Sequence, residues 1–158
     1  MKPVRLLSCL LLLCFIAGCS KEKDESTGIW FDLNGEKVIC QYSQSASWLD
    51  QKKGILLQGA FSQQFGRINI TIQADSPVST STYIYNPSLA TPNVKFEYFP
   101  SSAGSSFHRS DFMSDTPFSV SITSVSNSLV EGTFQGKVRM DAVVNTITNG
   151  RFSLLLNN

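Results

Sequence analysis

The side chains best suited to ligand chemistry in this 158-residue chain lie around its one histidine. His108 stands between Phe107 and Arg109, and Tyr98 lies a short distance before them in the sequence. Aromatic rings beside an arginine can bind a glycan or a peptide. These four residues are therefore candidates for a ligand-binding surface. The favoured alternative is that most of the aromatic side chains belong to the hydrophobic core.

His108 also raises the alternative of catalysis. Ser110 and Asp111 follow it closely, so the Ser–His–Asp arrangement of a small hydrolase can be drawn from these residue types. The sequence has no Gly-x-Ser-x-Gly turn of the kind that exposes a nucleophilic serine. A histidine in a loop is more often a solvated polar residue. The chain is therefore expected to be non-catalytic, and we assign no catalytic residue.

Cys19 is the second residue with a specific chemistry. It ends the sequence Ile16-Ala17-Gly18-Cys19, which follows an apolar run and precedes a polar one. This arrangement resembles a bacterial lipobox, in which the cysteine thiol takes a diacylglycerol through a thioether and the freed amine is acylated. Acyl chains on Cys19 would hold the protein on a membrane. The alternative is an ordinary secretory signal with a chance cysteine at its cleavage site.

Residues 1–18 have the three parts of a lipoprotein signal peptide: a positive start with Lys2 and Arg5, an apolar stretch, and small residues before the cleavage site. The apolar stretch covers residues 6–16 and is well short of the roughly 20 residues needed to span a bilayer. A permanent transmembrane helix is therefore not expected. Residues 19–28 are polar and mostly charged after the cysteine, which predicts a flexible tether.

The residues after Cys19 also indicate a location. Ser20 stands where an aspartate would favour retention in the inner membrane, and this resembles an outer-membrane lipoprotein. The charged cluster that follows resembles the acidic surface-export signal of Bacteroidetes-type lipoproteins, although Lys21 and Lys23 interrupt the acidic residues. We expect a lipid-anchored protein of the outer membrane. We favour the cell-surface side of this membrane, and the periplasmic side stays open as the alternative.

Removal of residues 1–18 changes the charge and the cysteine content of the chain. It takes Lys2 and Arg5 from 13 basic residues and leaves 11 against 12 acidic ones. Nucleic acid is therefore not an expected partner. Only Cys40 then stays unmodified, which excludes an intramolecular disulfide and predicts a small buried side chain. One histidine and one free cysteine cannot form a zinc site, so neither a metal nor a cofactor is expected.

Short runs of alternating apolar and polar residues predict an all-β domain over residues 29–158. The strongest hairpin signal is Asn34-Gly35, because a type I′ turn needs residues that tolerate positive φ. Residues 100–117 form a long segment that is either functional or hides a further strand. Strand structure is expected over residues 28–42, 46–49, 55–61, 67–73, 82–85, 94–99, 118–123, 129–141 and 146–156.

This spacing of short strands and polar turns favours one architecture over a second. The first is an antiparallel β-sandwich of the immunoglobulin or jelly-roll kind. The alternative is a partly closed, lipocalin-like barrel. Asn149-Gly150 interrupts the last strand and indicates a bulge or a tight turn there.

The C-terminal sequence contains Gly132-Thr133-Phe134 and, further on, the run Ile147-Thr148-Asn149-Gly150-Arg151-Phe152. These segments resemble an uncharacterised family of small Bacteroidetes-type all-β lipoproteins, which pair a "G-T-F" strand with a closing "T-N-G-x-F" strand. The chain departs from that family's opening hairpin, since Val38 and Ile39 stand where an aromatic residue is expected. The resemblance implies an all-β fold and an envelope location, and it implies no activity.

Taken together, these features predict a lipid-anchored module of the cell envelope that binds a partner without catalysis. The expected partner is a glycan, a peptide or another envelope protein. The alternative is a structural subunit of an outer-membrane or surface assembly, and a hydrolase that uses His108 is a weaker alternative.

Overall fold

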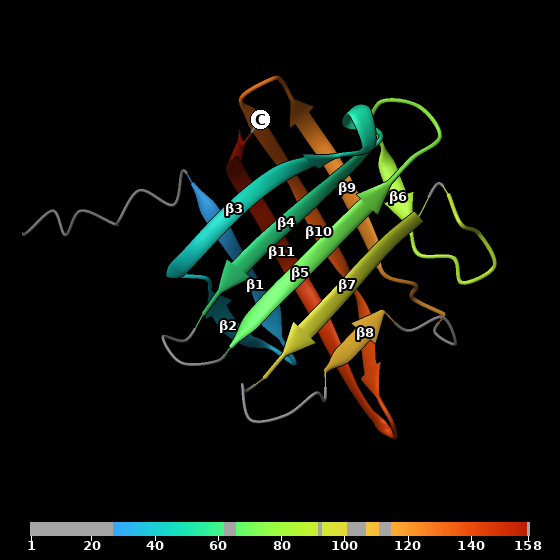
Figure 1. Ribbon diagram of the computed structural model, residues 1–158. Coiled ribbons are helices and arrows are strands. Elements are labelled where there is room, and N and C mark those ends of the chain that lie inside the picture. Colours follow the sequence, from blue (N-terminus) through green and yellow to red (C-terminus); the bar gives the residue numbers. More distant parts are fainter. Residues whose placement is uncertain (1–26, 62–65, 92, 101–106, 111–114, 158) are drawn as a thin grey trace, which may run out of the picture.

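The computed structural model describes residues 27–61, 66–91, 93–100, 107–110 and 115–157. Within these ranges the chain forms strands and one 3₁₀ turn, so the prediction of an all-β fold is confirmed (Figure 1). The elements are β1 (Gly28–Leu33), β2 (Glu36–Ile39), β3 (Tyr42–Leu49), η1 (Asp50–Lys52), β4 (Gly54–Ala60), β5 (Arg67–Gln73), β6 (Thr82–Ile84), β7 (Asn93–Phe99), β8 (His108–Ser110), β9 (Ser119–Val125), β10 (Leu129–Met140) and β11 (Val143–Asn157).

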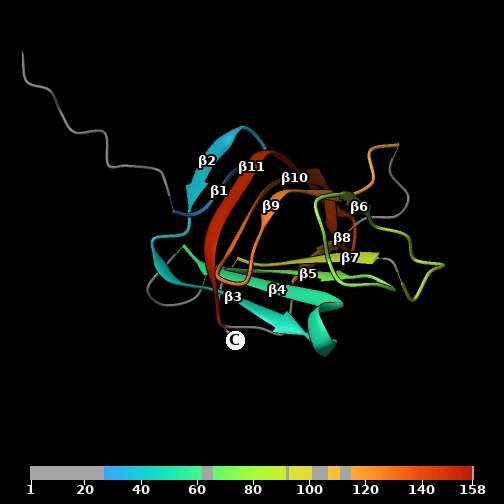
Figure 2. The same ribbon diagram turned by 90° about the horizontal axis from the view of Figure 1, so that it is seen from above.

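The strands form two layers that face each other across the core, as Figure 2 shows from above. One layer has the strand order β3-β4-β5-β7, and the other has the order β2-β1-β11-β10-β9-β6. The short strand β8 lies at a corner between the layers, because it pairs with β7 on one side and with β10 on the other. The arrangement is therefore like that of a β-sandwich.

The hairpin of β10 and β11 connects the two layers at both ends. The last residues of β11 pair with β3 through Leu156 and Ala46, and the far end of β10 pairs with β8 through Val138 and Ser110. Each of these corner pairings holds two residue pairs. The strands consequently form one continuous hydrogen-bonded sheet that folds over into two layers. In this structure the β-sandwich and the partly closed barrel, the two expected architectures, are therefore not sharply distinguished.

One pairing differs from the expected antiparallel arrangement. β11 runs parallel to β3, whereas the other pairings in the described part of the chain are antiparallel. β11 extends past the end of β1 and there meets a strand that is far from it in sequence. Its direction relative to β3 follows from the path of the whole chain, which local alternation does not encode.

The turns follow the chemistry of their residues. Asn34 and Gly35 both have positive φ, at 52° and 87°, and they join β1 to β2 as the sequence predicts. The interruption at Asn149 is a β-bulge: the register of β11 against β10 shifts by one residue between Gly150 and Ile147, and Asn149 has a φ of 53°. This outcome selects the bulge over the tight turn.

The core lies between the layers and is built around the ring of Phe134 from β10. Four other rings, from β1, β7, β11 and the residue before β9, have centroids 5.8 to 6.4 Å from it: Phe31, Phe96, Phe118 and Phe152. Cys40 is buried as expected, and burial raises the pKa of its thiol to about 12, so the thiol stays protonated at neutral pH.

Two glycines allow these rings to approach the neighbouring strands. A Cβ atom at Gly132 would lie 2.5 Å from the ring of Phe152 and too close to the carbonyl oxygen of Ser121. A Cβ atom at Gly150 would lie 2.6 Å from the ring of Phe134 and would also crowd that residue's carbonyl oxygen. Both positions therefore need glycine because of close packing.

We expect the substitution Gly150→Val to lower the free energy of unfolding by about 1–3 kcal/mol or more, because the added side chain would collide with β10 backbone and with the Phe134 ring. Urea unfolding followed by tryptophan fluorescence measures this change. Thr133→Val is the matched control, since Thr133 is exposed on β10 and its new methyl group faces solvent. Equal stability of Gly150→Val and the control would contradict the packing described here.

Candidate functional site

The residues singled out around the histidine lie at the corner formed by β7, β8 and β10. His108 begins β8, so the long segment before β9 does hide a strand. The side chain of His108 is only 4 % exposed, and its ring centroid lies 5.7 Å from that of Tyr98. The expectation of a solvated loop histidine is therefore wrong, because β8 is clamped between β7 and β10 and turns this side chain inward.

The buried imidazole is held by a chain of amide side chains. Asn145 of β11 places its Nδ2 3.3 Å from Nδ1 of His108 and 3.4 Å from Nε2, so it can donate to the ring nitrogen that carries no proton. The Oδ1 atom of Asn145 accepts a hydrogen bond of 2.8 Å from Nδ2 of Asn34. His108 is thereby connected to the turn between β1 and β2, two strands of the layer that contains β10.

The contacts of His108 do not form a hydrolytic triad from the described residues. Among the described residues its hydrogen-bond partner is Asn145, and the nearby Ser110 instead accepts a hydrogen bond of 2.8 Å on its Oγ from the backbone N–H of Phe96. Asp111, the third residue of the drawn triad, lies outside the described residues. A general base needs to reach the proton that it removes, and the imidazole is turned away from solvent here.

Tyr98 lies beside His108 and is also largely buried. Its ring stacks on that of Phe61, with centroids 5.5 Å apart and the planes inclined by 9°. Burial raises the pKa of the Tyr98 hydroxyl and lowers the pKa of the His108 imidazole below its ordinary value of 6.5. In both groups the neutral form is favoured, so this inner pair carries no charge at neutral pH.

Phe107 and Arg109 point to the outer side of the same corner. The ring of Phe107 stacks on that of Phe99, with centroids 4.9 Å apart. The guanidinium of Arg67 lies 4.4 Å from the centre of the Phe99 ring, and that of Arg109 lies 5.4 Å from the centre of the Phe107 ring. The protein's own arginines thus cover ring faces that the sequence suggested for a ligand, and these cation–π contacts hold the guanidinium groups in place.

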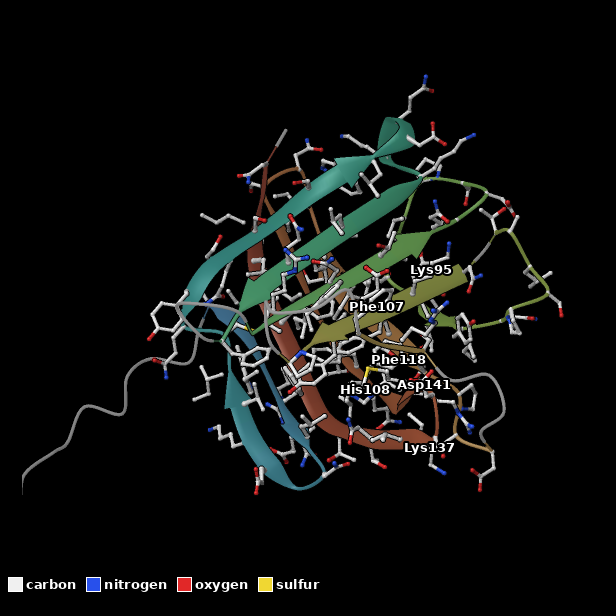
Figure 3. The ribbon with its side chains drawn as sticks, turned by 60° about the horizontal axis from the view of Figure 1, so that its bottom comes forward. Lys95, Phe107, His108, Phe118, Lys137 and Asp141 are labelled. Atoms are coloured by element: carbon white, nitrogen blue, oxygen red, sulfur yellow. The ribbon has the colours of Figure 1, made fainter. Side chains whose placement is uncertain are left out.

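A cleft of about 380 Å³ opens beside this stack. Its walls come from β8, from the end of β10, from the residue after β6 and from the turn between β10 and β11, and they include Tyr85, Phe107, Arg109, Arg139, Met140 and Asp141. Figure 3 shows Phe107, His108 and Asp141 gathered at this end of the molecule. Phe107 and Arg109 therefore line the cleft, whereas Tyr98 and His108 do not.

The strongest electrostatic feature of the cleft is a pair of arginines. Arg109 of β8 and Arg139 of β10 are direct cross-strand partners, so their side chains leave the sheet on the same face. Asp141 also lines this cleft. Sequence reasoning missed Arg139 and Asp141, because the pairing of β8 with β10 joins residues that are far apart in the chain.

Two features are absent from the described ranges: a cluster of metal-ligating side chains and a long apolar helix. No three His, Cys, Asp or Glu side chains come together there as a group that could hold a metal ion. Among the same residues, no helix has the length and the apolar character to cross a membrane. Cys19 lies outside the described residues, so its predicted lipidation stays a prediction.

Comparison with known proteins adds no relative: no protein family, no curated protein and no solved structure matches this chain. The cleft at the corner of β8 and β10 is therefore assessed from its own geometry.

The buried imidazole predicts a pH dependence of stability. Because the pKa of His108 is lowered in the folded protein, the unfolded chain takes up a proton first as the pH falls below 6.5. The stabilisation is complete above pH 6.5 and is lost as the pH falls toward the lower pKa of the folded state. We expect the substitution His108→Gln to remove this component of the slope.

Urea unfolding of the wild type and of His108→Gln between about pH 5 and pH 8 measures this component as the difference between the two slopes. The acidic residues titrate in both proteins and cancel in the comparison. Identical slopes for the two proteins would contradict the burial of a neutral imidazole.

Proposed function

We propose that this chain is a lipid-anchored protein of the cell envelope that binds a partner, without catalysis, through the cleft at the corner of β8 and β10. The cleft itself carries this proposal. Its volume of about 380 Å³ lies within the range of small-molecule sites, about 300–1,000 Å³. Its lining residues include two arginines, an aspartate and residues with apolar side chains.

The position of the cleft on the sheet supports a role in recognition. Arg109 and Arg139 stand on paired strands, so their backbones are fixed by the ladder between β8 and β10. Arg109 is held further by its contact with Phe107. Side chains that are fixed before binding lose little conformational entropy when a ligand arrives, which favours affinity and specificity.

The N-terminal segment supplies the proposed location. A lipid on Cys19, followed by the polar tether of residues 19–28, would hold the β domain away from an outer membrane. The surface-export resemblance of the tether favours the cell surface over the periplasm. The domain would then meet its partner in the medium or on the same membrane.

The two alternatives have less support. A hydrolase that uses His108 would need this imidazole at an accessible site, and the side chain is buried against Tyr98. A structural subunit that assembles by strand addition would need a long open edge. The outermost strands β2 and β6 have four and three residues, and Glu36 and Lys37 occupy the first of these edges.

The proposed anchor is tested with the substitution Cys19→Ala. Without the thiol no thioether can form, so we expect the variant to leave the membrane fraction and to lose incorporation of labelled palmitate. Cys40→Ala is the control, because this buried cysteine is not a lipid acceptor. Palmitate labelling of Cys19→Ala at the level of the wild type would contradict the proposed anchor.

The proposed binding role is tested by cross-linking and affinity capture of the full-length protein from its native envelope. We expect the wild type to retain a captured partner and Arg109→Gln to lose it, since this variant removes a charge from the cleft wall. Arg151→Gln is the matched control, because Arg151 is exposed on β11 and does not line the cleft. Capture that is unaffected by Arg109→Gln would contradict a role for this cleft.

A further inference from the structure

We propose that the outer face of β2, β1, β11 and β10, beside the point where the tether enters, lies on the lipid surface that holds Cys19, so that the cleft points away from the membrane. This inference rests on the proposed lipid anchor and adds the part of the domain that contacts the membrane. The contact is made by four apolar side chains, which we call the tether-side surface: Trp30, Ile39, Leu129 and Leu155.

Alternation along the strands places these four side chains on one outer face. The neighbours of Trp30 on β1 are at most 1 % exposed, so Trp30 itself points outward. Ile39 is the direct partner of Trp30 on β2 and leaves the sheet on the same side. On β11 the residues before and after Leu155 are buried, so Leu155 also points outward, and Leu129 is its partner on β10.

Two of these side chains are strongly exposed for large apolar residues. Leu155 is 68 % exposed, the highest value among the large apolar side chains of the described ranges, and Ile39 is 40 % exposed. Trp30 and Leu129 are half-buried. Apolar area that stays in water costs free energy, and contact with a second apolar surface removes this cost.

The outer face of the opposite layer has a different chemistry. Gln58 of β4 donates a hydrogen bond of 3.2 Å to Oδ1 of Asn69 on β5, and Nδ2 of Asn69 donates one of 3.3 Å to Glu97 on β7. This row of amide and acid side chains crosses three strands. A lipid surface would lose free energy by dehydrating it, so the layer of β1 and β11 is the better match.

The length of chain before the domain, and the point where it enters, indicate that a membrane occupies this surface. Cys19 and Gly28 are nine residues apart, so the chain between them spans at most about 32 Å. This chain enters β1 at Gly28, two residues before Trp30. Gly28 pairs with Ser153 on β11, two residues before Leu155. A lipid on Cys19 would therefore keep a membrane within reach of the tether-side surface.

The same geometry keeps the cleft away from the membrane. Asp141 lines the cleft at the turn between β10 and β11, and Figure 1 shows this turn at the opposite end of the domain from the start of β1. Val143 at that end is ten residues from Ser153, which is about 33 Å along an extended strand. The tether would have to extend fully along the domain to bring this turn to the lipid, and full extension costs conformational entropy.

The side chains of this surface suit the boundary between lipid and water. Tryptophan combines an apolar ring with an N–H donor and is enriched at this level of membranes. Four apolar side chains alone would hold a free protein only weakly. The tether makes their contact with the membrane intramolecular, which raises the effective concentration of the lipid surface.

The charged residues on the same face are compatible with this contact. Arg151 is exposed beside Trp30, and the long stem of an arginine can lie along apolar groups while its guanidinium stays in water. Glu131 is half-buried, and its Oε1 accepts a hydrogen bond of 3.0 Å from Oγ of Ser153. Neither charge therefore has to enter the apolar part of the membrane.

Quenching of tryptophan fluorescence by brominated lipids tests this inference on the full-length, lipidated protein. The protein is reconstituted into vesicles of phosphatidylethanolamine and phosphatidylglycerol that carry bromine on their acyl chains. The chain has two tryptophans, so Trp48→Phe leaves Trp30 as the reporter and Trp30→Phe leaves Trp48. Trp48 packs against the core. We expect the lipids to quench Trp30 at least twofold more strongly than Trp48.

Two further variants are made in the Trp48→Phe background. Leu155→Ser removes the most exposed side chain of the tether-side surface, and we expect it to reduce the quenching of Trp30 by at least half. Val143→Ser is the matched control, because Val143 is 53 % exposed at the opposite end of β11. We expect this control to leave the quenching unchanged, and thermal unfolding checks that both variants are folded.

Equal quenching of Trp30 and Trp48 would overturn the proposal, as would quenching that Leu155→Ser leaves unchanged or that Val143→Ser reduces equally. Cross-linking of two copies that Leu155→Ser abolishes, with Trp30 unquenched, would assign the surface to a second copy and overturn it too. Protein that floats with the vesicles while Trp30 stays unquenched would overturn this inference and leave the anchor standing. Full-length protein that does not float with the vesicles would overturn both.

Discussion

The pairing of β10 with β11 is the interaction on which the rest of this structure depends. These two strands form the longest ladder of the described chain. In their layer β1 pairs with the free side of β11, and β9 pairs with the free side of β10. Their ends reach β3 and β8 in the other layer. Gly132 and Gly150 make this possible, because they let the rings of Phe152 and Phe134 pack directly against the neighbouring backbone.

The same hairpin creates the corner where the cleft lies. β10 brings Arg139 opposite Arg109, the turn that follows it brings Asp141, and β11 brings Asn145 to the ring of His108. The inner side of the corner is neutral and hydrogen-bonded, whereas the outer side carries the arginine pair and the Phe99–Phe107 stack. Chemistry that needs charge is thus confined to the outer side, because burial disfavours charge on the inner side.

Local sequence patterns predicted the features that depend on local geometry. Asn34-Gly35 indicated a hairpin because few residues tolerate its φ values, and the alternation in residues 67–73 indicated a strand. In the structure the isoleucines of this strand, Ile68, Ile70 and Ile72, are buried. The environment of His108 could not be predicted in this way. Its burial arises from β7, β10 and Asn145, which are brought to it by strand pairing. A single amino-acid sequence does not show which distant strands will pair.

The sequence by itself determined the all-β character and most of the strands and turns. These properties follow from residue type and short-range alternation, which act within a few residues. Only the tertiary structure decided the parallel pairing of β11 with β3, the inward position of Tyr98 and His108, and the meeting of Arg109 with Arg139. Those features depend on closing the two layers around one core, and that closure is set by packing across the whole chain.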